Sequence, residues 1–283
     1  MLIMKKSQIK PLFLKLKYFL VFLFCCCSSH IYAQEDEKIS FYLPFHSNQF
    51  TKNIEKFNED LISTGFDNFE IKRSDIWQQY QQNIRTGELG VYFAAPHFSA
   101  WLIHKHDFIP LYRVDGNLKF VIASRIKDRD IFELSDLIEK KLCTQNPLNL
   151  DYLLINKSFK KSIQAPESYF VNSVYDEFTN PDSVCSAFSI SEHIYLQQEN
   201  KKPNKFIRLA QSKVLNNYAF LIHPSLINEY SIPLRKFLIK DSTKEHLSPF
   251  LQLLSHKTSL VDAKINDYPK EYIEELSKYW GKE

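Results

Sequence analysis

Residues 87–101 read GELGVYFAAPHFSAW and combine an apolar strand, a break and the start of a helix. The run from Val91 to Ala95 is wholly apolar, as in a strand that is covered on both faces of a parallel sheet. Pro96 lacks a backbone N–H and disfavours helical backbone at the residue before it, so the strand is predicted to end there. The segment from His97 to Trp101 then reads as a turn that enters a helix. α/β proteins place their ligands at such breaks.

The residues before this stretch alternate between strand and helix patterns. A first strand is predicted over 39–45, ending near Pro44, and a second over 69–73. Between them Phe50, Ile54 and Phe57 recur at helical spacing, and a further helix is predicted from Asp75 to Ile84. Strand, helix, strand, helix, strand at these lengths predicts a parallel sheet with right-handed crossovers.

The residues after it predict a second α/β unit. Strands over 108–113 and 118–124 are joined by a turn at Asp115-Gly116-Asn117. The charged stretch 125–130 reads as a crossover, after which the alternation restarts, with short strands over 141–144, 169–171 and 184–188. The last two strands are predicted over 206–210 and 217–222, and the chain is helical from Leu226 onward.

Length and composition narrow the class of protein. The 283 residues are 44% apolar, so the chain can build two lobes of ordinary size around real cores. Only five glycines occur, and no GxGxxG or GxxxxGK[ST] pattern is present. These patterns cradle nucleotide phosphates, so the sequence argues against that kind of nucleotide site.

The first 33 residues have the layout of a secretory leader. Lysines precede an unbroken apolar run from Tyr18 to Cys27, which is well short of the roughly 18–20 residues that span a bilayer. Small residues follow, and cleavage after Ala33 is predicted. Anchoring as a lipoprotein through Cys25, Cys26 or Cys27 is the alternative. The expected location is therefore the periplasm.

Removal of the leader changes the charge and the cysteine count. Five leader lysines subtracted from the formal charge of +3 leave −2, so the basic pI does not indicate nucleic-acid binding. Cys143 and Cys185 are then the remaining cysteines, and an oxidising compartment favours a disulfide between them. They lie at equivalent positions on two predicted strands. A catalytic pair of Cys143 and His97 is the alternative, and no third residue completes it.

Three segments carry a resemblance to a known family. GELGVYFAAPHF, LSDLIEKKLCTQNPLNLDYL and VCSAFSIS are similar to motifs of the phosphonate-binding (PhnD-like) branch of periplasmic solute-binding proteins of ABC transporters. The resemblance covers about residues 39–222. Gly90, Tyr92 and Ala95 depart from it, since the family often has Asp, Ala and Gly at these positions.

The resemblance implies a two-lobed α/β fold of the periplasmic-binding-protein type II, with mixed sheets, flanking helices and two crossing strands as a hinge. The implied lobes are residues 34–124 plus 218–283, and residues 125–217. A small-molecule solute, expected to be an oxyanion, would be held between them, and an ABC permease or a membrane sensor would be the partner. A monomer without enzymatic activity, cofactor or nucleic-acid partner is expected. A sensing or accessory protein is the alternative function.

The expected ligand site lies where strands end and helices begin, because a helix start offers backbone N–H groups to an anion. Each candidate residue could instead serve only as a cap or turn. The candidates are Phe45, His46 and Ser47; Pro96, His97, Phe98 and Ser99; Asn146, Leu148 and Asn149; Asn172 and Ser173; and Ser189.

The candidate residues also narrow the chemical class of the solute. Phosphonate-binding members carry Ser or Thr hydroxyls where this chain has Leu148-Asn149-Leu150, and Ser186 or Ser189 stands where an acid would bind an amine. This argues against 2-aminoethylphosphonate itself. His97, His104 and His106 have no thiol or well-spaced carboxylate beside them, and the tyrosines are scattered, so neither a metal site nor ferric-ion capture is predicted.

Overall fold

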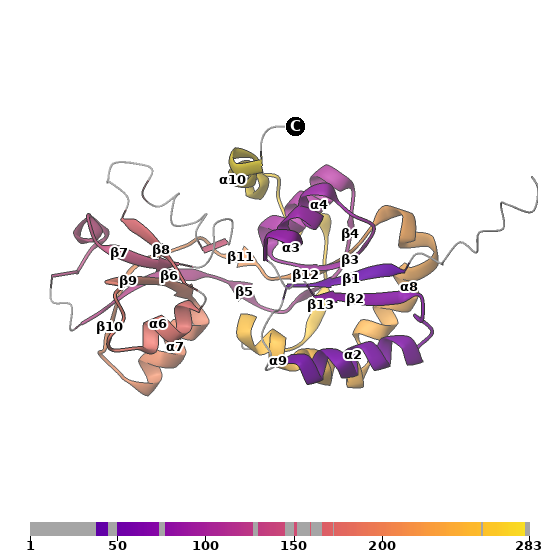
Figure 1. Cartoon of the computed structure of the whole chain (residues 1–283), viewed down its shortest axis with the longest axis horizontal. Helices are drawn as coiled ribbons and strands as arrows, with labels where there is room; N and C mark the ends of the chain where they lie inside the picture. Colours follow the sequence, from indigo (N-terminus) through magenta and orange to yellow (C-terminus); the bar gives the residue numbers. More distant parts are fainter. Residues whose placement is uncertain are drawn as a thin grey trace, which may run out of the picture. The chain divides into compact units, whose positions relative to one another are not determined.

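The computed structural model describes residues 38–44, 50–73, 77–126, 130–144, 150–151, 159, 166–171, 173–255 and 257–280. Within these residues the strands form a six-stranded sheet, a five-stranded sheet and a two-stranded ladder between β5 and β11 (Figure 1). The predicted leader lies outside the described residues. Among the helices that are described, none is long and apolar enough to cross a membrane.

The six-stranded sheet has the order β13-β4-β12-β3-β1-β2. Its parallel pairs β1–β2 and β1–β3 follow from the alternation of strands and helices in the sequence, whereas β12 runs antiparallel to both β3 and β4. The late strand β12 therefore lies near the middle of the sheet. The strands are β1 (Ile39–Leu43), β2 (Phe69–Arg73), β3 (Gly90–Ala94), β4 (Ile109–Val114), β12 (Ala219–Ile222) and β13 (Leu260–Asp262).

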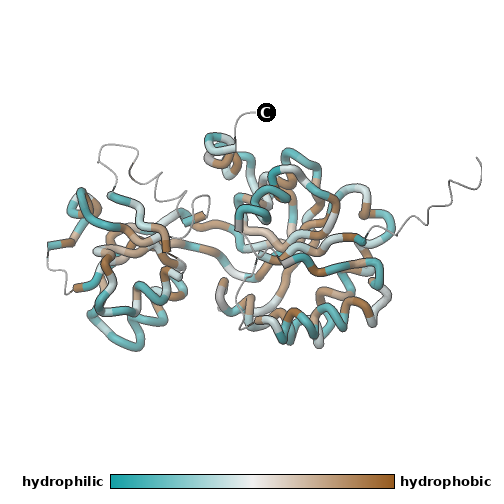
Figure 2. The backbone as a smooth tube through the Cα atoms, in the orientation of Figure 1, coloured by the Kyte–Doolittle hydropathy of each residue, from teal (hydrophilic) through white to brown (hydrophobic). Residues whose placement is uncertain are grey.

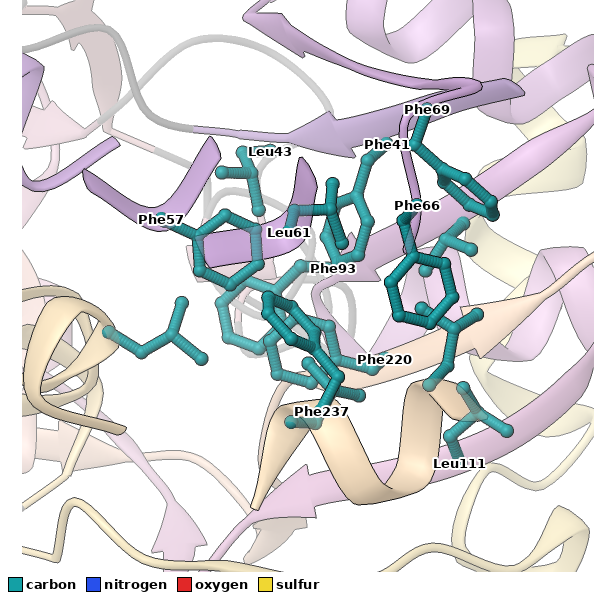
Figure 3. Packing of buried hydrophobic residues seen from close by; sticks show 14 of the residues in the cluster. Phe41, Leu43, Phe57, Leu61, Phe66, Phe69, Phe93, Leu111, Phe220 and Phe237 are labelled. Atoms are coloured by element: carbon teal, nitrogen blue, oxygen red, sulfur yellow. The ribbon is translucent and has the colours of Figure 1, made fainter. Parts of the chain in front are cut away.

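Helices cover both faces of this sheet, because its central strands are apolar on both sides (Figure 2). One face packs against α2 (Thr51–Ser63), α8 (Ile227–Leu238) and α9 (Asp241–Leu254). Phenylalanines dominate that core, and Phe93 and Phe220 from neighbouring strands meet with ring centroids 4.4 Å apart (Figure 3). The other face packs against α3 (Trp77–Thr86), α4 (Pro96–His106) and α10 (Glu271–Trp280).

Gly90, at the start of β3, leaves no room for a side chain. A Cβ atom there would lie 2.3 Å from the carbonyl oxygen of Ser40 on the neighbouring strand. We expect Gly90→Ala to lower the free energy of unfolding by about 2–3 kcal/mol, because backbone must move to relieve the contact. Urea unfolding measures this. Gly65→Ala is the matched control, since its Cβ would meet nothing within 4 Å and only its positive φ opposes the change; equal effects would contradict the prediction.

The five-stranded sheet has the order β10-β6-β9-β7-β8. One of its faces packs against α6 (Val174–Thr179) and α7 (Glu192–Lys201). The strands are β6 (Phe120–Arg125), β7 (Lys141–Thr144), β8 (Glu167–Phe170), β9 (Ala187–Ser191) and β10 (Phe206–Gln211). A short 3-10 helix over Leu134–Leu137 precedes β7.

The structure contains the Cys143–Cys185 disulfide, with the two Cα atoms 5.6 Å apart. Cys143 lies on β7, as predicted, but Cys185 precedes β9 instead of lying within it. The guanidinium of Arg125 explains the shift, because it donates a hydrogen bond to the carbonyl oxygen of Cys185 at 2.8 Å and to that of Asn180. These two carbonyl oxygens therefore accept hydrogen bonds from a side chain instead of from a neighbouring strand.

The turn at Asp115-Gly116 sends the chain from one sheet to the other. β4 pairs with β12 and β13, whereas β6 pairs with β9 and β10, so the two strands flanking the turn do not form a hairpin. The crossing residues form β5 (Asn117–Leu118), which pairs with β11 (Leu215–Asn216) on the return. Because β6 belongs to the five-stranded sheet, we propose that the lobes meet at β5 and β11, and that 120–124 belong to the second lobe.

Candidate functional site

Tyr218 lies at the edge of the first sheet where the parallel strands end. Ala219 pairs with Ala94, the last residue of β3, so Tyr218 stands beside the break that leads into α4. Its ring lies 5.6 Å from that of Phe93, and its carbonyl accepts a hydrogen bond from Val114 N–H at 2.9 Å. Carboxyl ends of parallel strands are where this class of sheet leaves room for a ligand.

Helix α4 begins at this same edge. Pro96 occupies its first turn and Ala95 stands at the N-cap, so no hydroxyl or carboxylate of the N-cap residue covers the helix start. Ser99, which the sequence predicts as a ligand residue, is fully buried, and its hydroxyl donates to the Ala94 carbonyl at 3.0 Å. The Ser99 side chain therefore fixes the helix to the strand that precedes it.

The other predicted residues of α4 are also buried. The ring centroid of His97 lies 3.9 Å from that of Phe98, which in turn stacks on Trp280 of α10 at 5.7 Å. Pro96 is buried as well. The structure thus brings these four residues together at the edge of the sheet, where their side chains support the helix start. Ligand contact through them stays a prediction.

Three buried polar side chains lie together near the carboxyl ends of the parallel strands β7 and β9 in the second sheet. Thr144 ends β7, and its hydroxyl donates to a carboxylate oxygen of Asp151 at 2.8 Å. Ser189 lies on β9, one residue after Phe188, which pairs with Cys143 of β7. Thr144 and Ser189 are therefore neighbours on parallel strands. All three side chains are buried, with Asp151 only 2% exposed.

A small apolar cluster joins this group to the crossing strands. Leu150, next to Asp151 in the chain, packs with Leu118 and Leu215, the two paired residues of β5 and β11. Tyr218 and Tyr272 of α10 pack against the same cluster. Burial raises the pKa of the Tyr218 phenol, and the charge of nearby Asp151 raises it further. Tyr218 thus packs against the cluster at the crossing strands as well as near Phe93 of the first sheet.

Of the remaining predicted ligand residues, one is a helix N-cap and the others lie outside the described residues. Ser173 is the N-cap of α6, and its hydroxyl accepts a hydrogen bond from Asp176 N–H at 3.2 Å. This supports the reading of Ser173 as a structural cap. The set outside the described residues is Phe45, His46, Ser47, Asn146, Leu148, Asn149 and Asn172.

The histidines near α4 have backbone partners. His104 Nε2 lies 2.7 Å from the Tyr268 carbonyl oxygen, and His106 Nε2 lies 2.8 Å from that of Arg85. Both imidazoles therefore tie the end of α4 to neighbouring segments. Among the described residues, no group of three His, Cys, Asp or Glu side chains is placed to hold a metal ion.

Sequence reasoning missed Thr144, Asp151 and Tyr218 as members of the candidate site. Asp151 falls one residue beyond the Leu148-Asn149-Leu150 segment that the sequence compares with the phosphonate-binding hydroxyls. Tyr218 reads as one residue of an apolar strand. A signal was available for two of them, since Thr144 ends the predicted strand 141–144 and Tyr218 is the second residue of the predicted strand 217–222, and ligand-contacting side chains gather at strand ends.

Known proteins resemble this chain in structure but not in sequence. The sequence matches no protein-family model, and no curated protein is similar enough to match. Among solved structures, PhnD1 from Prochlorococcus marinus in complex with methylphosphonate is 14% identical, with a TM-score of 0.64 over 86% of this chain and 100% of that one. XAC2383 from Xanthomonas citri bound to ATP is 14% identical, with a TM-score of 0.62 over 85% and 97% of the two chains.

A third structure is similar in the same way. The binding-protein component of a phosphonate ABC transporter from Pseudomonas aeruginosa is 12% identical, with a TM-score of 0.59 over 86% of each chain. At these identities the likeness establishes the fold. The chain has the α/β two-lobed fold of periplasmic binding proteins, with two mixed sheets, flanking helices and crossing strands β5 and β11.

Proposed function

We propose that this protein is an exported solute-binding protein that captures a small oxyanionic solute and delivers it to an ABC permease. The observation that carries the proposal is the position of Tyr218, which packs near Phe93 at the carboxyl edge of the first sheet and against the cluster of Leu118, Leu150 and Leu215 at the crossing strands. A solute at this point would meet both lobes. The expected place of action is the periplasm.

The mechanism is closure of the two lobes around the solute. A ligand that contacts both lobes binds the closed form more tightly than the open one, so it shifts the equilibrium toward closure. The paired strands β5 and β11 are the only crossings between the two sheets among the described residues, and they are two residues long. Rotation at this ladder would move one lobe as a unit.

The oxyanion would bind at the start of α4. This helix has 11 residues, and its aligned peptide dipoles place partial positive charge at the end beside Tyr218. Backbone N–H groups of a first turn point toward such a ligand, which is why phosphate groups are often bound there. The methylphosphonate complex of PhnD1 makes a phosphonate the first solute to test.

A thermal-shift screen tests the proposal with phosphate, phosphite, alkylphosphonates, sulfonates and amino acids. A true solute at 100 times its Kd stabilises the folded state by about 2.7 kcal/mol, so its shift should be plain. Small-angle scattering with the same solute should then show a smaller radius of gyration. A stabilising solute that leaves the radius unchanged would contradict closure. No response across the panel, with a membrane partner recovered by crosslinking, would favour the sensing alternative.

A further inference from the structure

The crossing strands β5 and β11 are too short to hold one geometry without support. Each is two residues long, and the ladder consists of the pairs Leu118–Leu215 and Asn117–Asn216. An isolated two-stranded ribbon is at best marginally stable in water. The contacts that flank the ladder must therefore determine how freely one sheet turns relative to the other.

Asp115, two residues before β5, is held by a later part of the chain. Its N–H donates to the Ser259 carbonyl at 2.9 Å, and its own carbonyl accepts from the Ser255 hydroxyl at 2.9 Å. Its carboxylate forms an ion pair with Lys257 at 3.0 Å. This ammonium group, followed by the N–H of Gly116, lowers the pKa of Asp115 from its ordinary value, so the carboxylate is charged at neutral pH. Asp115 is thus bound through its backbone and its side chain.

The return strand is held from the same direction. Asn216, the last residue of β11, donates from its side-chain amide to the Asp267 carbonyl at 2.8 Å. The phenol of Tyr268 donates to the carbonyl of Asn217 at 2.8 Å, and the Tyr268 side chain is fully buried. Both hydrogen bonds end on the residues where the return strand enters the first sheet. This end of the crossing is therefore fixed as well.

One segment provides all of these contacts, and we name it the C-terminal strap: Ser255 and residues 257–268. Its strand β13 pairs with β4, so the strap is part of the first sheet. Asp267 of the strap also forms an ion pair with Arg113 of β4 at 3.5 Å. The strap therefore ties the first-lobe ends of both crossings to the first lobe.

Glu192, the first residue of α7, provides the contacts on the second-lobe side. Its N–H donates to the Lys119 carbonyl at 2.8 Å, and its carboxylate pairs with the Lys119 ammonium group at 3.4 Å. The other carboxylate oxygen pairs with Arg208 of β10 at 2.8 Å. Ser212 N–H joins the two chain segments by donating to the Phe120 carbonyl at 2.8 Å. Both crossings are therefore held where they enter the second sheet.

These contacts leave two short runs of chain between them, residues 117–118 on the outgoing crossing and residues 213–215 on the return. We propose that the C-terminal strap and Glu192 anchor the two ends of the hinge, so that rotation of the lobes is confined to these two runs. This inference rests on the proposed function, because it assigns the device that guides the motion of the lobes. A hinge held in this way has less conformational freedom to lose on closure, which favours solute binding.

Distances between the lobes test this inference without any solute. Glu55 and Asn200, exposed on α2 and α7, are each replaced by p-acetylphenylalanine, whose ketone takes a spin label and leaves the cysteines untouched. Pulsed dipolar spectroscopy then measures the distribution of distances between the labels in solute-free protein. We expect a narrow distribution for the chain with an intact strap, because rotation is limited to the two runs.

Variants of the strap should broaden this distribution. Asn216→Ala combined with Tyr268→Phe removes two hydrogen bonds to the return crossing, and Lys257→Met removes the ion pair on the outgoing side. In the double variant the amides of residues 213–216 should exchange with solvent about fivefold faster, as expected for the loss of one ordinary hydrogen bond. The matched control is Asp262→Asn. Asp262 lies on β13 of the strap but pairs with Arg235 of α8 at 2.9 Å, so the distribution should keep its width.

Glu192→Gln tests the anchor of the second lobe. It preserves the shape of the side chain and the backbone hydrogen bond, but it removes the charge that pairs with Lys119 and Arg208, so the distribution should broaden. Salt at about 1 M should broaden the wild-type distribution in the same direction, because the Debye length falls to about 3 Å and partly exposed ion pairs are screened. An unchanged width in Glu192→Gln would overturn this anchor.

The outcomes separate this inference from the proposed function. If the double variant and Lys257→Met stay as narrow as Asp262→Asn, the strap does not restrain the hinge and the inference is wrong. If the double variant does not fold, Lys257→Met decides alone, since the Lys257 side chain is 60% exposed and its loss removes no core contact. Broadening in the strap variants, with no response to any solute of the panel, would overturn the proposed function and leave the hinge assignment standing.

Discussion

Reduction of the Cys143–Cys185 disulfide is expected to lower the free energy of unfolding by about 4 kcal/mol. The two cysteines are 42 residues apart, and a cross-link that closes a loop of this length restricts the unfolded chain by about that amount. Both cysteine side chains are buried in the core between the second sheet and helices α6 and α7. Reduction should therefore break the S–S bond with little change in packing. Urea unfolding with and without reductant measures the difference.

The double variant Cys143→Ala/Cys185→Ala controls for the other cysteines. Reductant should not change its stability, because Cys25, Cys26 and Cys27 belong to the predicted leader. Without reductant it should be less stable than the wild type by at least the cost of the lost cross-link. A wild type that unfolds at the same urea concentration in both conditions would show that the cross-link does not form in the purified protein.

Trp280→Ala is expected to destabilise the first lobe by about 3 kcal/mol, within the range for removal of a buried aromatic side chain. Trp280 is 9% exposed and stacks on Phe98, while its ring meets Trp101 edge-on at 4.7 Å. Both partners belong to α4. The loss should therefore loosen the helix start proposed to bind the anion, and solute affinity should fall together with stability.

The neighbouring residue provides the matched control. Tyr279 is 45% exposed on the same helix, so Tyr279→Ala should cost less than about 1 kcal/mol and leave solute affinity unchanged. Urea unfolding and calorimetric titration are applied to both variants. If Trp280→Ala loses stability yet binds solute as tightly as the wild type, the start of α4 does not depend on its contact with α10, and the anion site must be placed elsewhere.

The sequence predicts the first lobe well because its pattern is strong. The apolar run at Val91, the break at Pro96 and helical spacing around Phe57 each depend on local chemistry, and the corresponding elements occur close to the predicted bounds. The second lobe is less regular. There β9 begins at Ala187 instead of Val184, because Arg125, distant in sequence, takes the carbonyl of Cys185.

The route of the chain between the sheets could not be read from local pattern. Two strands flanking Asp115-Gly116 look like a hairpin in sequence, and the choice of partners for β6 depends on strands more than 60 residues later. The candidate site has the same limitation. The pairing of Thr144 with Asp151 is local, but the influence of the Asp151 charge on the pKa of Tyr218 links residues that are far apart in sequence. Burial is what distinguishes Asp151, at 2% exposure, from an ordinary surface acid.

The position of β12 delays completion of the first sheet during synthesis of the chain. This strand lies between β3 and β4, so the first sheet lacks a central member until residues 219–222 have been made. The second sheet is built wholly from residues 120–211, and its ends are joined where Ser212 N–H donates to the Phe120 carbonyl at 2.8 Å. The inserted lobe can therefore fold first. The lobe that contains β1 therefore stays incomplete longest, which fits the export that we propose for this chain.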